Sequence, residues 1–159
     1  MVAETLSTTS MTKQPSQPHG GGLLCCAYGT YEVAANVEAG DIFEMCKIPP
    51  GSTIVGGMFY CDDLDTGTEA LDLDVGWAAN GNEDADPDGL GNYGVLTGDV
   101  LAAGNLSNVA GLIYPFMGEF ANGDLPTFTA ETTIQVVANA PAGTFTAGAM
   151  SVVVYYVVD

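Results

Sequence analysis

The chain has 159 residues, with twenty carboxylates against two lysines (Lys13 and Lys47), one histidine (His19) and no arginine, so its formal net charge is -18. This charge excludes nucleic acid as a partner, because affinity for phosphate backbones comes largely from Lys and Arg. The same scarcity removes the usual general bases and electrostatic stabilisers of an enzyme. We therefore expect no catalytic residues, and a protein that acts by binding other proteins.

The composition favours a folded domain built from strands. Hydrophobic residues make up 47% of the chain and charged residues 14%, and glycine occurs 21 times. Helix formers are scarce relative to Val, Thr and Gly, which favours strands and turns. We find no signal peptide, and the longest apolar run, residues 152–158, is too short to span a bilayer. We expect no membrane contact and folding in a cytoplasm.

The first 22 residues differ in composition from the rest. Residues 1–22 are rich in Ser, Thr, Gln, Pro and Gly, show no periodicity and end in three glycines. Such a segment is expected to be a polar, flexible arm, followed by a domain over residues 23–159. It is either an idle tail or a tether that orders on a partner. For the tether, the candidate contact residues are Lys13, Gln14, Pro15 and His19.

From Leu23 onward, short apolar or alternating runs recur between turn signals such as Pro-Pro-Gly, Pro-Asp-Gly and Asn-Gly-Asp. The runs predict strands over residues 23–33, 41–48, 53–62, 70–78, 95–101, 112–121, 128–140 and 144–158. No segment shows a sustained helical stripe of apolar residues. The pattern predicts an all-β fold, a single antiparallel β-sandwich of the jelly-roll type.

Two predicted strands indicate more than their type. Residues 71–75 alternate strictly, so Asp72 and Asp74 are expected to share a solvent-facing side. The run at residues 152–158 is apolar on both faces and must be covered twice, by a long loop or by another subunit. We favour a subunit, because tyrosine is common at interfaces. The predicted oligomer interface is Val154, Tyr155, Tyr156 and Val157.

The four cysteines have no metal-binding spacing. Cys25 and Cys26 are adjacent, Cys46 and Cys61 are isolated, and no histidine lies near any of them in sequence. Zinc is therefore not expected. We favour reduced, buried thiols over two disulfides.

Residues 80–89 form the most site-like segment. Asp84, Asp86 and Asp88 followed by Gly89 match the opening of a calcium-binding loop, in which alternate carboxylates converge on the ion. The match then fails, because Val95 stands where the bidentate glutamate belongs. We favour a solvated acidic turn, with a weak calcium site at the three aspartates as the alternative and no other cofactor.

A second acidic cluster, Asp62, Asp63, Asp65 and Glu69, lies in a predicted hairpin connection. Paired carboxylates can hydrolyse glycosides, but these residues are expected to be exposed loop residues without a sugar platform. Trp77 is the only tryptophan and is expected to fill the core, with sugar stacking as the alternative.

The order of several segments resembles the small β-sandwich decoration, or cement, proteins of tailed bacteriophage heads. The segments are IPPGSTI (residues 48–54), LDLDVG (71–76), DADPDGL (84–90) and AGTFTAGAMSVVVYYV (142–157). The resemblance implies an oligomer, expected to be a homotrimer, on the outside of a capsid lattice assembled in the host cytoplasm, bound to the major capsid protein. It supplies no catalytic residues. The acidity and the long polar arm depart from simple cement proteins.

Two alternatives remain open at this stage. One is a phage surface or fibre-type module that recognises carbohydrate or a host receptor, with or without calcium. Another explanation of the charge is life in high salt, where carboxylates stay hydrated and their repulsion is screened.

Overall fold

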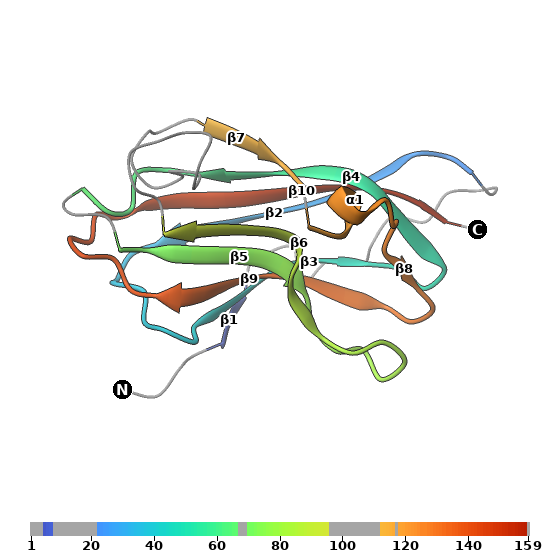
Figure 1. The fold of residues 1–159 in the computed structure, drawn as a ribbon, viewed down its shortest axis with the longest axis horizontal. Helices are drawn as coiled ribbons and strands as arrows, with labels where there is room; N and C mark the ends of the chain where they lie inside the picture. Colours follow the sequence, from blue (N-terminus) through green and yellow to red (C-terminus); the bar gives the residue numbers. More distant parts are fainter. Residues whose placement is uncertain (1–4, 8–21, 67–69, 96–111, 117, 159) are drawn as a thin grey trace.

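The structure, a computed structural model, describes residues 5–7, 22–66, 70–95, 112–116 and 118–158. Its strands form two sheets that lie as two layers (Figure 1). The first sheet runs, in spatial order, β1 (Thr5–Ser7), β3 (Ile42–Ile48), β9 (Thr132–Ala140), β5 (Asp72–Trp77) and β6 (Asp86–Val95). The second runs β2 (Cys25–Val33), β10 (Gly148–Val158), β4 (Ser52–Cys61) and β7 (Leu112–Pro115), with β8 (Thr127–Phe128) also beside β4.

Alternation along the strands places the core between the two sheets. In β10, every second residue from Met150 to Tyr156 is buried while its neighbours are partly exposed. In β3, Phe43, Met45 and Ile48 face the core. The largest fully buried side chains are Tyr156, Phe43, Phe59, Phe128, Met45, Ile48, Ile54, Leu64, Leu71, Leu73 and Leu90. The predicted all-β sandwich is confirmed, and its jelly-roll topology stays a prediction.

The sheets are antiparallel except at one edge. β1 pairs with β3 in parallel, with Thr5 opposite Ile42 and Ser7 opposite Glu44. Thr5–Ser7 lie within the predicted flexible arm, so this part of the arm is a strand instead. Without β1, the edge of β3 would present unpaired N–H and C=O groups. The remainder of the arm up to Gly21 lies outside the described residues.

Two of the predicted strands differ from the structure, and a third lies almost wholly outside the described residues. The run over residues 128–140 splits into β8 and β9, which belong to different sheets. The run over 112–121 is the strand β7 followed by the short helix α1 (Gly118–Asn122). Val95 ends β6, and residues 96–101 of another predicted strand lie outside the described residues. No helix in the described ranges has the length and apolarity to cross a membrane.

Local chemistry explains the break after β7. Pro115 has no N–H for the ladder, which ends the strand. Gly123 then closes α1 with a φ of 87°, and its N–H donates to the carbonyl of Phe120 at 3.1 Å. The N–H of Asp124 donates to the carbonyl of Glu119 at 3.2 Å, which completes a glycine cap of the helix end.

Candidate functional site

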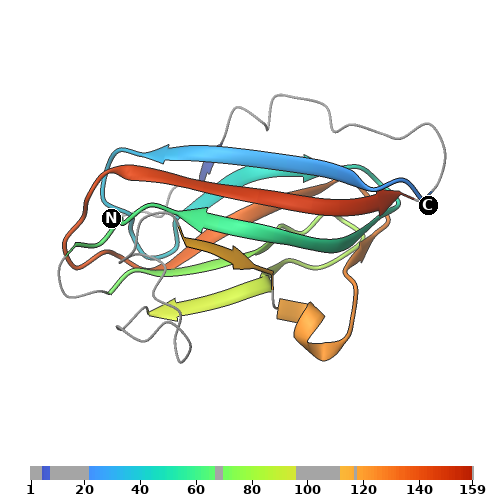
Figure 2. The same ribbon diagram turned by 90° about the horizontal axis from the view of Figure 1, so that it is seen from above.

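The solvent side of β2, β10 and β4, called the outer face below, is apolar in its middle rows, and hydroxyl residues such as Thr30 and Ser151 lie in a flanking row. These three strands lie side by side in the view from above (Figure 2). Val153 lies opposite Tyr28 on β2 and opposite Met58 on β4. In the next row, Tyr155 lies opposite Cys26 and Gly56. Cross-strand neighbours of this kind touch, so each row forms one continuous strip.

The structure divides the predicted oligomer interface between two faces. Val154 and Tyr156 are fully buried in the sandwich core, so their prediction as interface residues is wrong. Burial nevertheless alternates along the C-terminal strand, because successive side chains point to opposite faces of the sheet and only one face packs against the core. Tyr155 and Val157 are partly exposed and lie on the outer face.

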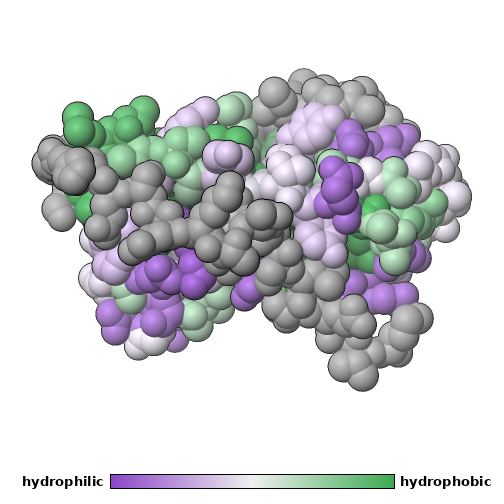
Figure 3. All heavy atoms as spheres, turned by 180° about the vertical axis from the view of Figure 1, so that it is seen from behind, coloured by the Kyte–Doolittle hydropathy of each residue, from purple (hydrophilic) through white to green (hydrophobic). Residues whose placement is uncertain are grey.

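Large hydrophobic residues are exposed on and beside this face. Tyr28 is 62% exposed, and Leu23 and Leu24, which precede β2, are 57% and 66% exposed. Val55 is 40% exposed at an irregularity in the β4–β10 register, where Tyr155 pairs with Gly56 and Tyr156 with Ile54. Figure 3 shows strongly hydrophobic residues gathered at one end of the molecule, in the upper left of the view. Clustered exposed apolar residues typically mark an interaction site.

The outer face carries almost no charge. β2, β10 and β4, of 9, 11 and 10 residues, contain one charged residue, Glu32 on β2. The strands of the first sheet carry Glu44, Lys47 and four aspartates. The two sheets therefore differ sharply in charge, although the chain as a whole has a net charge of -18.

The predicted acidic turn at Asp84–Gly89 is wrong, because residues 86–95 form the strand β6. The turn lies earlier, at Asn80–Glu83, where Gly81 has a φ of 93° and the Asn80 side chain accepts hydrogen bonds from the N–H groups of Asn82 and Glu83. Pro87 is tolerated because β6 is an edge strand.

Gly89 serves close packing instead of a turn. A Cβ atom at this position would lie 2.3 Å from the ring of Trp77. The Trp77 side chain is 8% exposed, meets Phe128 edge to face at 5.1 Å, and donates from Nε1 to the carbonyl of Asp84 at 3.1 Å. Its prediction as a core residue is confirmed.

The strand keeps two of the proposed calcium ligands, Asp86 and Asp88, close together and leaves Asp84 outside it. Asp86 and Asp88 share one side of β6, and Asp84 precedes the strand. Burial, followed by the neighbouring Asp88 carboxyl, raises the pKa of Asp86. In the described ranges no group of three or more His, Cys, Asp or Glu side chains is arranged to hold a metal ion. The convergence that a calcium loop needs is therefore not formed by these three residues.

An acidic hollow of about 230 Å³ lies beside Trp77. Apolar atoms of Trp77, Leu125 and Phe128 line it together with carboxylates. The carboxylates belong to Glu83, Asp84, Asp86, Glu119 and Asp124. The hollow brings together the tryptophan and two of the aspartates that the sequence had singled out.

Asp65 is a structural carboxylate, where an exposed loop residue had been predicted. It is fully buried, and its oxygens accept four backbone N–H groups, from Ala70 and Leu71 on one side and Gly143 and Thr144 on the other, at 2.8–3.2 Å. Burial alone would raise the pKa of Asp65, but the four donors outweigh it and lower the pKa. The carboxylate ties the loop after β4 to the loop before β10.

The prediction that Asp74 faces solvent on β5 is also wrong. Asp74 is 5% exposed, and its Oδ2 accepts a hydrogen bond from Asn139 Nδ2 at 2.6 Å. Burial raises the pKa of Asp74 despite this donor, and the charges of Asp72 and Asp88 act in the same direction. β5 lies between β9 and β6, and the Asn139 side chain on β9 contacts the Asp74 carboxylate, so strict alternation did not lead to an exposed carboxylate here.

The four cysteines are all free thiols. Cys46 and Cys61 are buried, and burial raises the pKa of each to about 12. Cys25 is partly buried and Cys26 is exposed on the outer face. A raised pKa keeps the two buried thiols protonated and unreactive.

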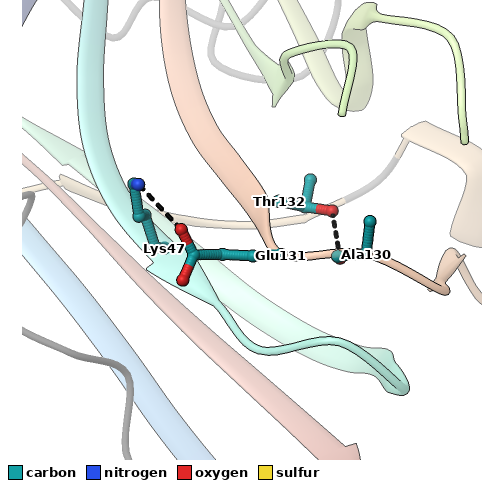
Figure 4. Close-up of polar contacts among 4 residues, drawn as sticks. All are labelled: Lys47, Ala130, Glu131 and Thr132. Carbon is teal, nitrogen blue, oxygen red and sulfur yellow. Dashed lines mark hydrogen bonds and ion pairs between the residues drawn. The ribbon is translucent and has the colours of Figure 1, made fainter. Parts of the chain in front are cut away.

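Cationic groups contribute little to the described surface. Lys47, the only lysine in the described ranges, forms an ion pair with Glu131 at 2.7 Å (Figure 4). The predicted arm residues Lys13, Gln14, Pro15 and His19 lie outside the described residues. The sequence could not reveal Tyr28, Val55 and Leu24 as a group, since only the pairing of β2 and β4 with β10 brings them to one face.

Three solved structures share this architecture. A chain in "Capsid of Ralstonia phage GP4" aligns with a TM-score of 0.74 and 21% identity over 98% of both chains. A chain in "Cyanophage Pam1 capsid asymmetric unit" gives 0.66 and 23%, covering 92% of this chain and 94% of that one. A chain in "Acidic stable capsid structure of Helicobacter pylori bacteriophage KHP30" gives 0.59 and 10%, covering 87% and 90%. No protein-family model and no curated protein matches the sequence.

These likenesses define the class of fold. The chain has the β-sandwich fold found in chains of phage capsid structures, over nearly its whole length. At identities below a quarter, the likeness establishes the fold, and the function has to be argued from the surface.

Proposed function

We propose that this protein is a structural virion protein, a decoration or cement protein that binds the outer surface of the major capsid lattice and stabilises it. The observation that carries the proposal is the likeness, over 87% to 98% of this chain, to chains of three phage capsid structures. The partners are the major capsid protein and further copies of this chain, as a homotrimer. The protein is placed on the virion exterior after assembly in the host cytoplasm, and it is not an enzyme.

The described surface supports a role in binding. The buried reactive groups of the described residues have structural roles: the Asp65 carboxylate accepts backbone hydrogen bonds, and the Cys61 thiol is packed in the core. An anionic exterior keeps decorated particles soluble and mutually repelling. Many copies that each bind weakly stabilise a lattice by mass action and avidity.

We propose that the segment around Lys13, Gln14, Pro15 and His19 contacts the capsid, because it holds cationic groups on an otherwise acidic chain. Deleting residues 1–22 also removes β1 and opens the edge of β3. A sharper variant therefore keeps β1 and replaces Lys13, Gln14, Pro15 and His19 with serine.

We expect the serine variant to remain folded by circular dichroism and to lose at least about tenfold in affinity for purified capsids in co-sedimentation, since several contacts act together. The control is Lys47→Ser, which removes the other lysine from the first sheet and should leave capsid affinity unchanged. Undiminished binding by the serine variant would refute the role of the arm.

The hollow beside Trp77 favours a second candidate, recognition of carbohydrate or a host receptor. Its apolar and carboxylate lining is chemistry that can stack and hydrogen-bond a sugar. Against it, the ring of Trp77 is largely buried and its N–H is already bound to Asp84. A glycan screen with and without calcium, read by calorimetry, separates this candidate from capsid decoration.

A further inference from the structure

The fold of the single chain leaves several large hydrophobic side chains of the outer face exposed to solvent. Tyr28, Leu23, Leu24 and Val55 are each at least 40% exposed on or beside three nearly uncharged strands. Among the described residues, the only other large hydrophobic residue that is exposed is Leu125, which lines the acidic hollow. Such a concentration of apolar residues on one side of a highly charged protein calls for an occupant.

We infer that the occupant is a second copy of this chain, which packs its own outer face against this one. The inference rests on the proposed self-association and departs from the homotrimer, because two identical faces packed against each other close a two-fold dimer. The contact residues are Tyr28, Val153, Tyr155 and Val157, with Leu24 and Val55 at the margin. Val154 and Tyr156 are excluded because they lie in the core.

Charge is the reason to choose a second copy. Two chains with a charge of -18 repel each other, so they associate most readily where each has the least charge. The outer face meets this condition, with Glu32 as the single charged residue of its strands. A basic partner would gain nothing here and would be drawn to the carboxylates of the first sheet and the acidic hollow.

The carboxylates of the first sheet lie far from the proposed contact. Packed sheets lie about 10 Å apart, so the aspartates of β5 and β6 stand behind the contact plane by more than the Debye length of about 8 Å at physiological salt. Across a face-to-face contact, the aspartates of the two copies are roughly 30 Å apart. Their repulsion is therefore largely screened.

The size of the face is sufficient for the centre of an interface. Three strands about nine residues long measure about 30 Å by about 14 Å. Side-chain relief adds accessible area to this plan, and Leu23 and Leu24 extend it at one end. The plan of about 420 Å² is about half of the roughly 800 Å² per partner of a standard interface, so the three strands supply the centre of the contact and flanking residues supply the remainder. Homomeric interfaces are also more apolar than others, as this face is.

The test is sedimentation equilibrium of the isolated full-length protein at micromolar concentration, with Tyr28→Glu as the variant. Tyr28 sits opposite Val153 in the row at the middle of the face. We expect the wild type to be oligomeric and the variant to lose about 100-fold or more in self-association constant, as for a central interface residue. Leu125→Glu is the matched control, because it adds the same charge at an exposed hydrophobic residue off this face, and it should stay oligomeric.

A second variant and a second measurement guard against misfolding. Leu24→Ser removes a 66% exposed side chain outside any strand and should weaken self-association while the circular dichroism spectrum is unchanged. Site-resolved alkylation of Cys26, which pairs with Tyr155 on the face, should be slow in the wild type and fast in both variants.

Two results would overturn the inference. One is a monomeric wild type. The other is an oligomer that withstands Tyr28→Glu and Leu24→Ser with Cys26 freely alkylated throughout. Because no capsid is present in these measurements, failure of self-association is distinguishable from failure of capsid binding, which the arm variant tests separately.

Discussion

At the scale of single residues, the carboxylates of this chain have opposite roles that their sequence context does not reveal. Asp65 is buried and accepts four backbone hydrogen bonds, which lower its pKa. Asp74 is buried with one side-chain donor, and burial raises its pKa. Both were predicted to be exposed. The difference comes from which backbone N–H groups the tertiary fold brings within reach.

We predict that Asp65→Asn lowers the free energy of unfolding by about 2 to 3 kcal/mol at neutral pH, because an amide cannot accept all four N–H groups that the carboxylate accepts. The measurement is urea unfolding followed by circular dichroism. Asp124→Asn, at an exposed aspartate, is the matched control and should change stability little.

The same pair of variants tests the pH dependence. A carboxyl with a lowered folded pKa stabilises the native state above its unfolded pKa of about 4, and this contribution is lost as pH falls through the folded pKa. Asp65→Asn should therefore show a smaller loss of stability than wild type below about pH 4. An identical dependence of stability on pH in variant and wild type would contradict the stabilising role of the Asp65 carboxylate.

At the scale of elements, turn chemistry misled the prediction where strands needed glycine or proline for other reasons. Pro87 and Gly89 looked like a turn, but Pro87 sits on the edge strand β6 and Gly89 makes room for Trp77. The run at residues 128–140 looked like one strand, but β8 and β9 pair in different sheets. Periodicity identifies a strand, and only long-range pairing decides which sheet it joins.

Gly29 on β2 lies at a close approach of the two sheets. A Cβ atom there would lie 1.9 Å from the backbone carbonyl oxygen of Met45 on β3. We predict that Gly29→Ala destabilises the protein by about 3 kcal/mol, since backbone atoms of both sheets must move. Thermal unfolding measures this, with Thr30→Ala as the control, which removes only one exposed side-chain hydrogen bond, to Ser151, and is expected to cost less. Similar midpoints for the two variants would show that the sheets separate easily.

At the scale of the whole molecule, the two sheets divide the surface into a nearly neutral side and an acidic side. The total charge was evident from composition, but its distribution was not. This separation lets one protein keep an anionic exterior and still offer an apolar face. It also bears on whether the acidity is an adaptation to salt.

We predict that the protein stays folded at about 10 mM salt, below the concentration at which surface charges are strongly screened. Carboxylates such as Asp65 and Glu83 are satisfied by donors of the chain itself, including the N–H of Thr129, and do not need bound cations. Circular dichroism during dialysis to low salt is the measurement, with 1 M salt as reference. Unfolding on salt removal would favour a saline origin of the charge.

The sequence by itself determined the fold class and the residue chemistry. Alternation and turn residues indicated the all-β sandwich, and Trp77 was placed in the core. Only the tertiary structure decided which side each strand presents, that β1 closes the edge of β3, and that Tyr28, Val55 and Tyr155 meet on one face. The physical reason is that side-chain alternation is a local property of the backbone, whereas pairing register depends on contacts between residues far apart in the chain.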